Sequence, residues 1–338
     1  MKRWARRSKS AIIAFKIWQN WRLRRRFASG SIETEHGSSL RRKTLQESID
    51  YIDAQFEDYL QYGELSGRDL SGKRILELGF GDNVGVALRF LASGASQVVC
   101  IDKFYSERDA SRERELYAAL RDRMSPAERQ RVDEVVEISA DLKFNEDRLK
   151  RINGLDLTQG SGMLVERGEV FDIVISRAVI EEIYEPQQVF AVLDQLLAPN
   201  GLMLHKIDMT DYGIFSDGGM HPLTFLTIPN PVYKLMATDS GIPNRKLIGD
   251  YKQITKDLHH ESRFFITSLV GHGPLVPHKE FHELDNESFQ SARSKITEIR
   301  SKLLPPYRDL PNDELMISGV FLISRKQGTN NGHPVATN

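Results

Sequence analysis

The chain of 338 residues is long enough for one large domain or two small ones, and its 40% hydrophobic and 28% charged residues are typical of a globular protein. Cys100 is the only cysteine, which excludes an internal disulfide and a multi-cysteine metal site. No apolar run approaches the roughly 20 residues of a transmembrane helix. We therefore expect a cytoplasmic protein.

The charge is distributed unevenly along the chain. Residues 1–32 contain ten Lys or Arg and no acidic residue, although the whole chain carries a net charge of −1. Ile13, Ile17 and Trp21 repeat at helical spacing within this basic arm, which predicts a helix with one apolar stripe flanked by cations. Such a helix suits an anionic membrane surface, contacted through residues 1–27, and suits equally a solvated arm or one docked on protein. No specific nucleic-acid partner is predicted, because no reading module accompanies the charge.

Strands and helices alternate regularly after this arm. The expected strands are residues 74–78, 97–102, 135–141, 171–179, 202–208, 263–271 and 314–326. The expected helices are residues 40–62, 86–94, 107–131, with a break near Ser125-Pro126, and 186–201. Regular β/α alternation favours a doubly wound parallel sheet.

The division of the chain follows from these elements. We expect an arm and linker at residues 1–39, one domain at residues 40–330 and a flexible tail at residues 331–338. Residues 211–258 are rich in Gly, Pro and aromatic residues and are expected to form an insertion that covers the substrate.

A glycine-rich turn, Gly79-Phe80-Gly81-Asp82-Asn83-Val84-Gly85, follows the first strand and precedes a helix. Glycines let the backbone approach a ligand, and the helix N-terminus offers free N–H groups. A P-loop is excluded, because no Lys-Ser/Thr pair follows. A dinucleotide fold is disfavoured, because Val84 stands at the third glycine position of G-x-G-x-x-G.

The stretch Glu77-Leu-Gly-Phe-Gly-Asp82 resembles the first motif of class I S-adenosylmethionine-dependent methyltransferases. The resemblance extends over residues 70–210 and 260–326, through an acid at the end of the second strand, the segments FDIVISRAVIEEIYEP and LLAPNGLMLH, and the two terminal strands. It implies a Rossmann-like doubly wound seven-stranded sheet, with a parallel core and a C-terminal antiparallel hairpin. It also implies the cofactor S-adenosyl-L-methionine.

The resemblance implies how the cofactor is held. Glu77 is expected near the ammonium end, Asp102 on the ribose hydroxyls and Asp141-Leu142 at the adenine. The full set of expected cofactor-binding residues is Glu77, Gly79, Phe80, Gly81, Asp82, Asn83, Asp102, Lys103, Asp141, Leu142, Ser176 and Arg177.

The acceptor is expected beyond the carboxyl ends of the strands. His205 and His221 are candidate general bases, with Asp208 as an orienting partner, and the insertion supplies Tyr212, Tyr233 and Arg245 as candidate substrate residues. No metal site is predicted, because the spacing of His259, His260, His272 and His278 matches no ligand motif.

Two departures from the family's patterns bear on the acceptor. The family often carries V-L-E-H after its fourth strand, and Glu182 stands here in place of that histidine. The N-P-P-Y type motif of amino methylation is absent, since Ser176-Arg177-Ala178-Val179 occupies its place. We expect O-methylation of a small molecule, or of a sugar in a surface glycan or lipid-linked precursor. A catalytically silent cofactor-binding protein and an NAD(P)-dependent oxidoreductase are the alternatives.

Overall fold

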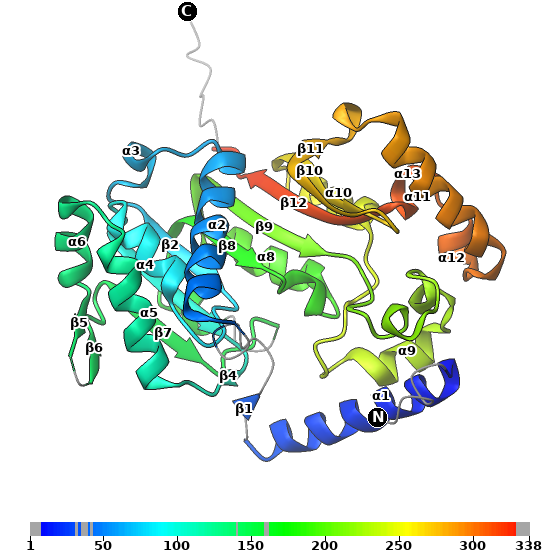
Figure 1. The fold of residues 1–338 in the computed structure, drawn as a ribbon, viewed down its shortest axis with the longest axis horizontal. Coiled ribbons are helices and arrows are strands. Elements are labelled where there is room, and N and C mark those ends of the chain that lie inside the picture. The colour runs from blue at the N-terminus through cyan, green and yellow to red at the C-terminus, as the bar shows by residue number, and fades with distance from the viewer. Residues whose placement is uncertain are drawn as a thin grey trace, which may run out of the picture.

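The computed structural model describes residues 8–30, 33–34, 40, 43–139, 141–158 and 162–328. Its centre is an eight-stranded sheet in the order β11-β10-β12-β9-β8-β2-β3-β7 (Figure 1). These strands are β2 (Arg74–Leu78), β3 (Gln97–Asp102), β7 (Leu149–Asn153), β8 (Phe171–Arg177), β9 (Leu197–Asp208), β10 (Glu261–Leu269), β11 (Gly273–Glu280) and β12 (Ile317–Arg325). The five strands from β9 to β7 are parallel, and β12, β10 and β11 add antiparallel pairs at the other end.

Helices lie on both faces of this sheet and beside one of its ends. They are α1 (Lys9–Ala28), α2 (Leu45–Gly63), α3 (Gly67–Leu70), α4 (Gly85–Ala92), α5 (Ala110–Asp122), α6 (Pro126–Asp133), α7 (Gly162–Glu166), α8 (Pro186–Leu196), α9 (Asn230–Ala237), α10 (Ile248–Asp257), α11 (Asn286–Ile299), α12 (Pro305–Arg308) and α13 (Asn312–Leu315). The predicted α/β class is confirmed, and so is the break between α5 and α6, where Ser125 and Glu128 form a capping box.

The predicted number of seven strands is wrong, because β11 is an eighth strand. Its sequence, GPLVPHKE, contains two prolines and is mostly exposed, so it lacks the apolar alternation that identifies a strand. As the edge of the sheet it pairs only with β10, and an edge tolerates proline.

The predicted third strand, residues 135–141, of which Ala140 lies outside the described residues, is wrong in its length and in its place in the sheet. Residues there form β5 (Val136–Ile138), which pairs with β6 (Leu142–Phe144) in a separate small hairpin. The third parallel strand is β7, with the polar sequence LKRIN. Since β7 is the opposite edge of the sheet, it needs few apolar residues, and its sequence carries a weak strand signal.

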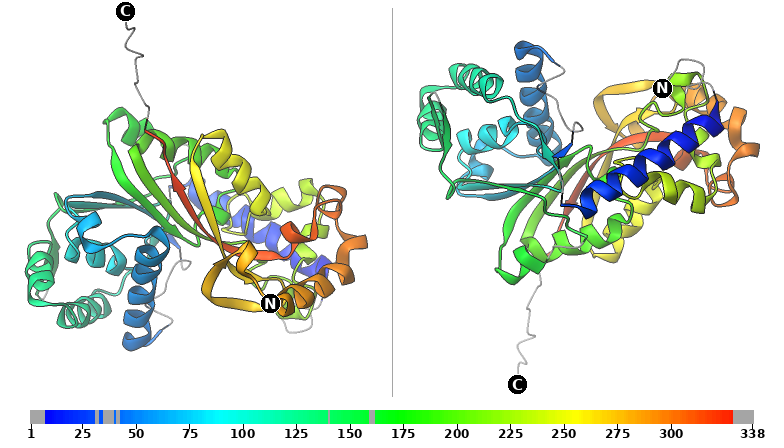
Figure 2. Two further views of the ribbon diagram at one scale, coloured as in Figure 1. Left: turned by 90° about the horizontal axis from the view of Figure 1, so that it is seen from above. Right: turned by 90° about the horizontal axis from the view of Figure 1, so that it is seen from below.

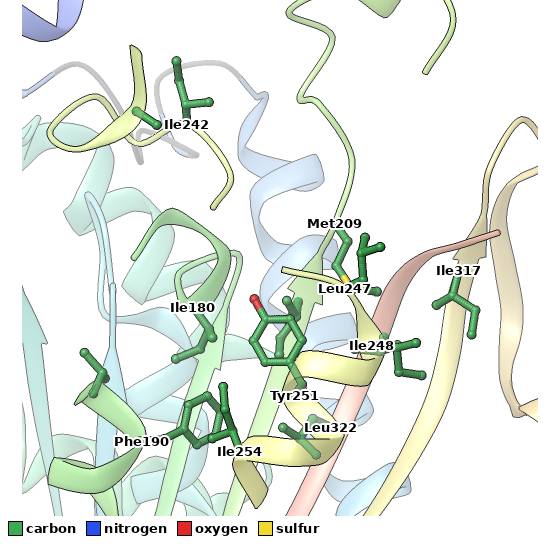
Figure 3. Close-up of a cluster of buried hydrophobic side chains, with 14 of the residues drawn as sticks. Ile180, Phe190, Met209, Ile242, Leu247, Ile248, Tyr251, Ile254, Ile317 and Leu322 are labelled. Carbon is green, nitrogen blue, oxygen red and sulfur yellow. The ribbon is translucent and has the colours of Figure 1, made fainter. Parts of the chain in front are cut away.

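Two layers of apolar side chains cover the two faces of the sheet. Ile75 points into the layer under α2, α4 and α5, while its neighbour Leu76 points into the layer under α8 and α10. This alternation follows from the two-residue period of a strand. Figure 3 shows the second layer, where Tyr251 and Ile254 of α10 lie beside Phe190 of α8.

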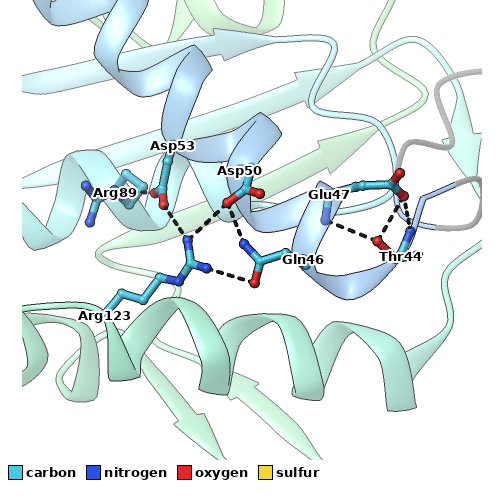
Figure 4. A network of polar contacts seen from close by, with 7 residues as sticks. All are labelled: Thr44, Gln46, Glu47, Asp50, Asp53, Arg89 and Arg123. Carbon is cyan, nitrogen blue, oxygen red and sulfur yellow. Dashed lines mark hydrogen bonds and ion pairs between the residues drawn. The ribbon is translucent and has the colours of Figure 1, made fainter.

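A polar network joins α2 to α4 and to the end of α5 (Figure 4). Arg123 donates to Asp50 and Asp53 at 3.3 and 3.4 Å, and Arg89 of α4 pairs with Asp53 at 3.2 Å. Thr44 caps the first turn of α2. These contacts matter for the site, because α2 supplies one wall of the cavity described below.

Helix α1 packs along α9, which belongs to the predicted insertion (Figures 1 and 2). Asn20 is buried between them: its Nδ2 donates to the carbonyl of Leu235 and to Oγ1 of Thr238, both at 3.1 Å, and its Oδ1 accepts from the Asp239 N–H at 2.8 Å. The predicted basic helix therefore exists and is docked within the chain. Within the described ranges, no helix is long and apolar enough to cross a membrane.

Candidate functional site

A cavity of about 850 Å³ opens at the carboxyl ends of the parallel strands. Its floor is formed by residues that follow β2, β3, β7 and β8, and its walls come from α1, α2, α9 and the turn after β8. This is the place where open α/β sheets bind ligands, and the volume is sufficient for a nucleoside-sized molecule together with a second ligand.

The glycine turn after β2 takes up conformations that favour glycine. Gly79 and Gly81 have φ values of +71° and +62°, and both line the cavity with Phe80 and Asn83. Asn83 stabilises the start of α4, since its Oδ1 accepts from the Gly85 N–H at 3.0 Å. The backbone of the turn is thus open to the cavity without an intervening Cβ at Gly79 and Gly81.

Asp82 lies outside the cavity lining. Its side chain is buried and accepts from the backbone N–H of Leu40 at 2.9 Å and from Nδ2 of Asn83 at 3.0 Å. The structure therefore gives Asp82 a supporting role behind the turn.

Asp102 stands at the end of β3 and lines the cavity. One carboxylate oxygen accepts from the Phe104 N–H at 2.9 Å and the other from the Gly81 N–H at 3.3 Å. These two bonds hold the carboxylate in place, while burial raises its pKa. Each oxygen keeps a second lone pair for a ligand hydroxyl.

Glu77 is the buried acid at the end of β2. Burial raises its pKa to about 7, against the opposing effect of the Cys100 thiol 3.4 Å from its Oε2. It is open to the cavity, so a cation bound there would restore its charge.

A third acid, Asp156, follows β7. Its Oδ2 pairs with Lys103 at 2.9 Å, and its Oδ1 accepts from the N–H and hydroxyl of Thr158 at 2.9 and 2.6 Å. Burial opposes ionisation, but these bonds lower the pKa of Asp156 overall. Asp156 and its neighbour Leu155 line the cavity, at the place that the sequence analysis assigns to Asp141 and Leu142.

Asp141 and Leu142 themselves lie outside the cavity lining. Asp141 is exposed just before β6 of the small hairpin, and Leu142 is the first residue of that strand. Because the third parallel strand is β7 and not residues 135–141, the residues that follow this strand and line the cavity are Leu155 and Asp156.

Ser176 and His205 form a buried pair beneath the site. The Ser176 hydroxyl lies 2.7 Å from Nδ1 of His205, whose ring packs edge-on against Phe190. Burial lowers the pKa of His205 to about 3, so the ring is neutral. Neither residue lines the cavity, although the sequence places Ser176 on the cofactor and His205 at the acceptor.

His221 and Asp208 also lie outside the lining. Nδ1 of His221 accepts from the Leu223 N–H at 3.0 Å, and its Nε2 lies 2.8 Å from the carbonyl of Lys295. Asp208 accepts from the Thr210 N–H at 2.8 Å. Both ring nitrogens of His221 are thus engaged, one within the insertion and one between the insertion and α11, and neither histidine lines the cavity.

Arg177 lines the cavity at the end of β8, as predicted for a cofactor-binding residue. Its Nη1 donates to Asp58 of α2 at 2.8 Å, and its guanidinium lies 5.6 Å from the centre of the Tyr51 ring. The side chain therefore connects the sheet to the α2 wall.

Only one of the three predicted substrate residues lines the cavity. Tyr212 does so, and its hydroxyl donates to Glu181 at 2.9 Å. Tyr233 is buried in the insertion, donates to the carbonyl of Pro243 at 2.7 Å and stacks with Arg245, which is itself buried against backbone carbonyls. Tyr233 and Arg245 hold the insertion together.

Sequence reasoning missed several residues of the cavity wall. They are Arg24 of α1, Tyr51, Gln55 and Tyr59 of α2, Glu182, Tyr184 and Gln188 near α8, and Lys234 of α9. Helical spacing identifies Tyr59 as buried, but it gives no sign that α2 lies over the strand ends, since that depends on tertiary packing. For Glu182, the sequence offered one signal of a place in the cavity, namely that it stands at the position of the family's histidine.

No protein-family model matches the chain, and no curated protein is detectably similar to it. Several solved structures match it at low similarity. A methyltransferase from Mesorhizobium loti described as S-adenosylmethionine dependent is 13% identical, with a TM-score of 0.39, and the match covers 81% of this chain and all of that one. The CurJ carbon methyltransferase is 11% identical, with a TM-score of 0.36, and covers 76% of this chain, which spans only 49% of CurJ.

Phosphoethanolamine N-methyltransferase 2 of Haemonchus contortus, solved with S-adenosyl-L-methionine, is 12% identical with a TM-score of 0.37. That match covers 80% of this chain and 60% of the other. Similarities of this size assign neither a family nor an activity to the chain, and the function is inferred below from the cavity itself.

Proposed function

We propose that the protein is an S-adenosylmethionine-dependent methyltransferase. The observation that supports this most strongly is the set of three acids, Glu77, Asp102 and Asp156, at the ends of three adjacent strands around a glycine turn that contains no Lys or Arg. The turn offers a phosphate group no cationic side chain, whereas the acids around it suit a cationic nucleoside.

The residues present fit the parts of this cofactor. Asp102 is oriented to accept hydrogen bonds from two ribose hydroxyls, and Asp156 with Leu155 lies one strand further along, where a base would lie. The ammonium group of the cofactor would be the counter-charge of Glu77. When bound, the cofactor supplies an electrophilic methyl group, and the chain's part is to align an acceptor with it.

The cavity also carries groups that suit a hydroxylated acceptor. Tyr51, Tyr184 and Tyr212 give aromatic faces, and Gln55 and Gln188 add amide groups for hydrogen bonds. We therefore propose O-methylation of a small molecule, or of a sugar in a glycan or lipid-linked precursor.

The first experiment is calorimetric titration with S-adenosylmethionine, S-adenosylhomocysteine and NADH. We expect micromolar binding of the first two ligands and none of NADH, with binding lost in Asp102→Ala and retained in Asp147→Ala, which removes an exposed acid at the amino end of β7. Binding of NADH alone would overturn the proposal in favour of an oxidoreductase. Binding without turnover on a panel of hydroxylated acceptors would favour a silent cofactor-binding protein.

We further propose that α1 contacts an anionic membrane surface, through a different face from the one the sequence suggests. Ile13 and Ile17 pack against the hydrophobic core, so the stripe they form is not available to lipid. Trp21, predicted on the same stripe, is 50% exposed, and Phe15 and Trp18 beside it are 36% and 49% exposed, so these three residues form the outer face of α1.

Cations flank this outer face. Arg22 and Arg25 lie over the rings of Trp18 and Trp21, 5.7 and 4.1 Å from the ring centres. Exposed Trp beside Arg on a surface helix suits the interface of an anionic bilayer. Arg24 of the same helix lines the cavity, so a membrane bound here would lie near its opening.

Co-sedimentation with lipid vesicles tests this contact. We expect binding to vesicles that contain phosphatidylglycerol, weak binding to pure phosphatidylcholine, and at least tenfold weaker binding of Trp18→Ala/Trp21→Ala. Met163→Ala/Val170→Ala is the matched control, since both residues are 44% exposed elsewhere on the molecule. Equal binding of the two double variants would contradict the proposal. A dimer of the wild type that is absent in Trp18→Ala/Trp21→Ala would also contradict it, because the outer face would then be a contact between two copies of the protein.

A further inference from the structure

Glu182 differs from Asp102 and Asp156, the neighbouring acids of the cavity, in the partners of its carboxyl group. It ends the 3-10 turn Ile180–Glu182 after β8 and lines the cavity. Within the part of the chain that the structure describes, its carboxyl group makes no hydrogen bond or ion pair, whereas Asp102 accepts two N–H bonds and Asp156 is paired with Lys103. Glu181, beside it, accepts from the Asp208 N–H and from Tyr212.

The surroundings of Glu182 make an ionised carboxylate costly. Burial raises its pKa well above the ordinary value, and the neighbouring charges of Glu181 and Asp102 add to the effect. A buried charge of this kind is stable only beside an opposite charge or several donors. Because the cavity is the open side of the group, that partner would be a ligand.

The chain also leaves room at this carboxyl. Gly241 of the insertion has a φ of +64°, and a Cβ built there would lie 3.2 Å from Oε2 of Glu182. Any larger residue at 241 would crowd the carboxyl group. Gly241 lines the cavity too, so Glu182 stands where the strand-end wall meets the insertion wall.

The 3-10 turn that carries Glu182 determines where this residue lies along the cavity. Val179 packs on Gly79 of the glycine turn, and the Glu182 N–H donates to the Val179 carbonyl at 3.0 Å. Glu182 is thus one turn beyond the residue that touches the glycine turn, between the part of the cavity with Glu77 and Asp102 and the part with Tyr212. In a methyltransferase the sulfonium is the cofactor atom at this boundary, because its methyl group must face the acceptor.

We propose that Glu182 is the counter-charge of the cofactor's sulfonium. This inference rests on the proposed function and adds a recognition residue to it. A carboxylate here favours S-adenosylmethionine, whose sulfur is positively charged, over S-adenosylhomocysteine, whose sulfur is neutral. Loss of this attraction after transfer aids release of the product.

Binding measurements without an acceptor test the inference. Calorimetry on Glu182→Gln should show about tenfold weaker binding of S-adenosylmethionine, with the affinity for S-adenosylhomocysteine changed less than twofold. Glu185→Gln is the matched control, because it removes the same charge from the same cavity three residues later. It should leave the ratio of the two affinities as in the wild type.

Each other result has a distinct meaning. If Glu182→Gln weakens the binding of both ligands equally, or of neither, the role of Glu182 is overturned, because the two ligands differ in charge only at sulfur. The same ratio change in Glu185→Gln would also overturn it, since any carboxylate of the wall would then suffice. Failure of the wild type to bind either ligand would instead contradict the methyltransferase proposal.

Discussion

A Cβ built on Gly79 would lie 2.2 Å from Cγ2 of Val179, far inside contact distance. The turn after β2 and the turn after β8 therefore pack with no space for a side chain at 79. This contact fixes the glycine turn against the residues that lead to Glu182, and it couples the two halves of the candidate site.

Gly79→Ala should therefore lose both stability and ligand binding. The substitution adds a steric clash to a left-handed φ of +71°, and we expect a cost of about 2–4 kcal/mol in the free energy of unfolding. Gly168→Ala is the control, because Gly168 has a φ of +65° with no atom within 4 Å of the added Cβ. It should cost about 1–2 kcal/mol from backbone strain alone. Urea unfolding and titration with S-adenosylhomocysteine measure the two effects, and equal losses would contradict the contact.

Asp156 gives a second prediction, on the cofactor. Asp156→Asn should weaken binding of S-adenosylhomocysteine about tenfold, because it removes the acid at the end of β7 and the partner of Lys103. Asp141→Asn should leave binding unchanged, since Asp141 is exposed outside the cavity. The reverse order of effects in calorimetry would restore the assignment made from sequence.

This pair of residues also shows how far the sequence predicts the site. Strands buried on both faces, such as RILEL and QVVCID, carry a strong apolar signal, and Gly79 after the first and Asp102 at the end of the second line the cavity. An edge strand such as β7 is polar, so its end could not be located.

The acceptor side was less predictable for a different reason. A histidine at a strand end has the same sequence signal whether it faces a ligand or the core, and His205 faces the core. That α2 forms a wall of the cavity depends on tertiary contacts between residues distant in sequence, namely its buried apolar face and the network of Arg89 and Arg123.

Asn20 tests the docking of α1. Asn20→Ala would leave the Asp239 N–H and the Leu235 carbonyl without their side-chain partner, and we expect the docked helix to lose about 1–3 kcal/mol. Hydrogen exchange of the α1 amides should rise accordingly. Trp18→Ala, on the outer face, should leave exchange as in the wild type. Equal exchange in Asn20→Ala and the wild type would show that these bonds do not hold the helix.

Glu181 predicts a dependence of stability on pH. Its side chain is buried, and burial above all raises its pKa from the ordinary 4.5 to about 8 in the folded protein. Between these two values the folded state holds a proton that the unfolded state has released. The free energy of unfolding should therefore fall as pH rises from about 5 to 8, by at most about 1.4 kcal/mol per pH unit from this group.

Glu181→Gln removes this titration while keeping an acceptor for the Asp208 N–H and the Tyr212 hydroxyl. We expect urea unfolding of the variant to show a shallower decline over the same range, with the difference largest at pH 8, where the wild type must bury a partly ionised carboxylate. Burial also raises the pKa of Glu77, to about 7, so part of the decline in the free energy of unfolding remains in both proteins. Parallel curves for the variant and the wild type would mean that Glu181 is ionised in the folded protein throughout, and that its bonds from Asp208 and Tyr212 outweigh burial.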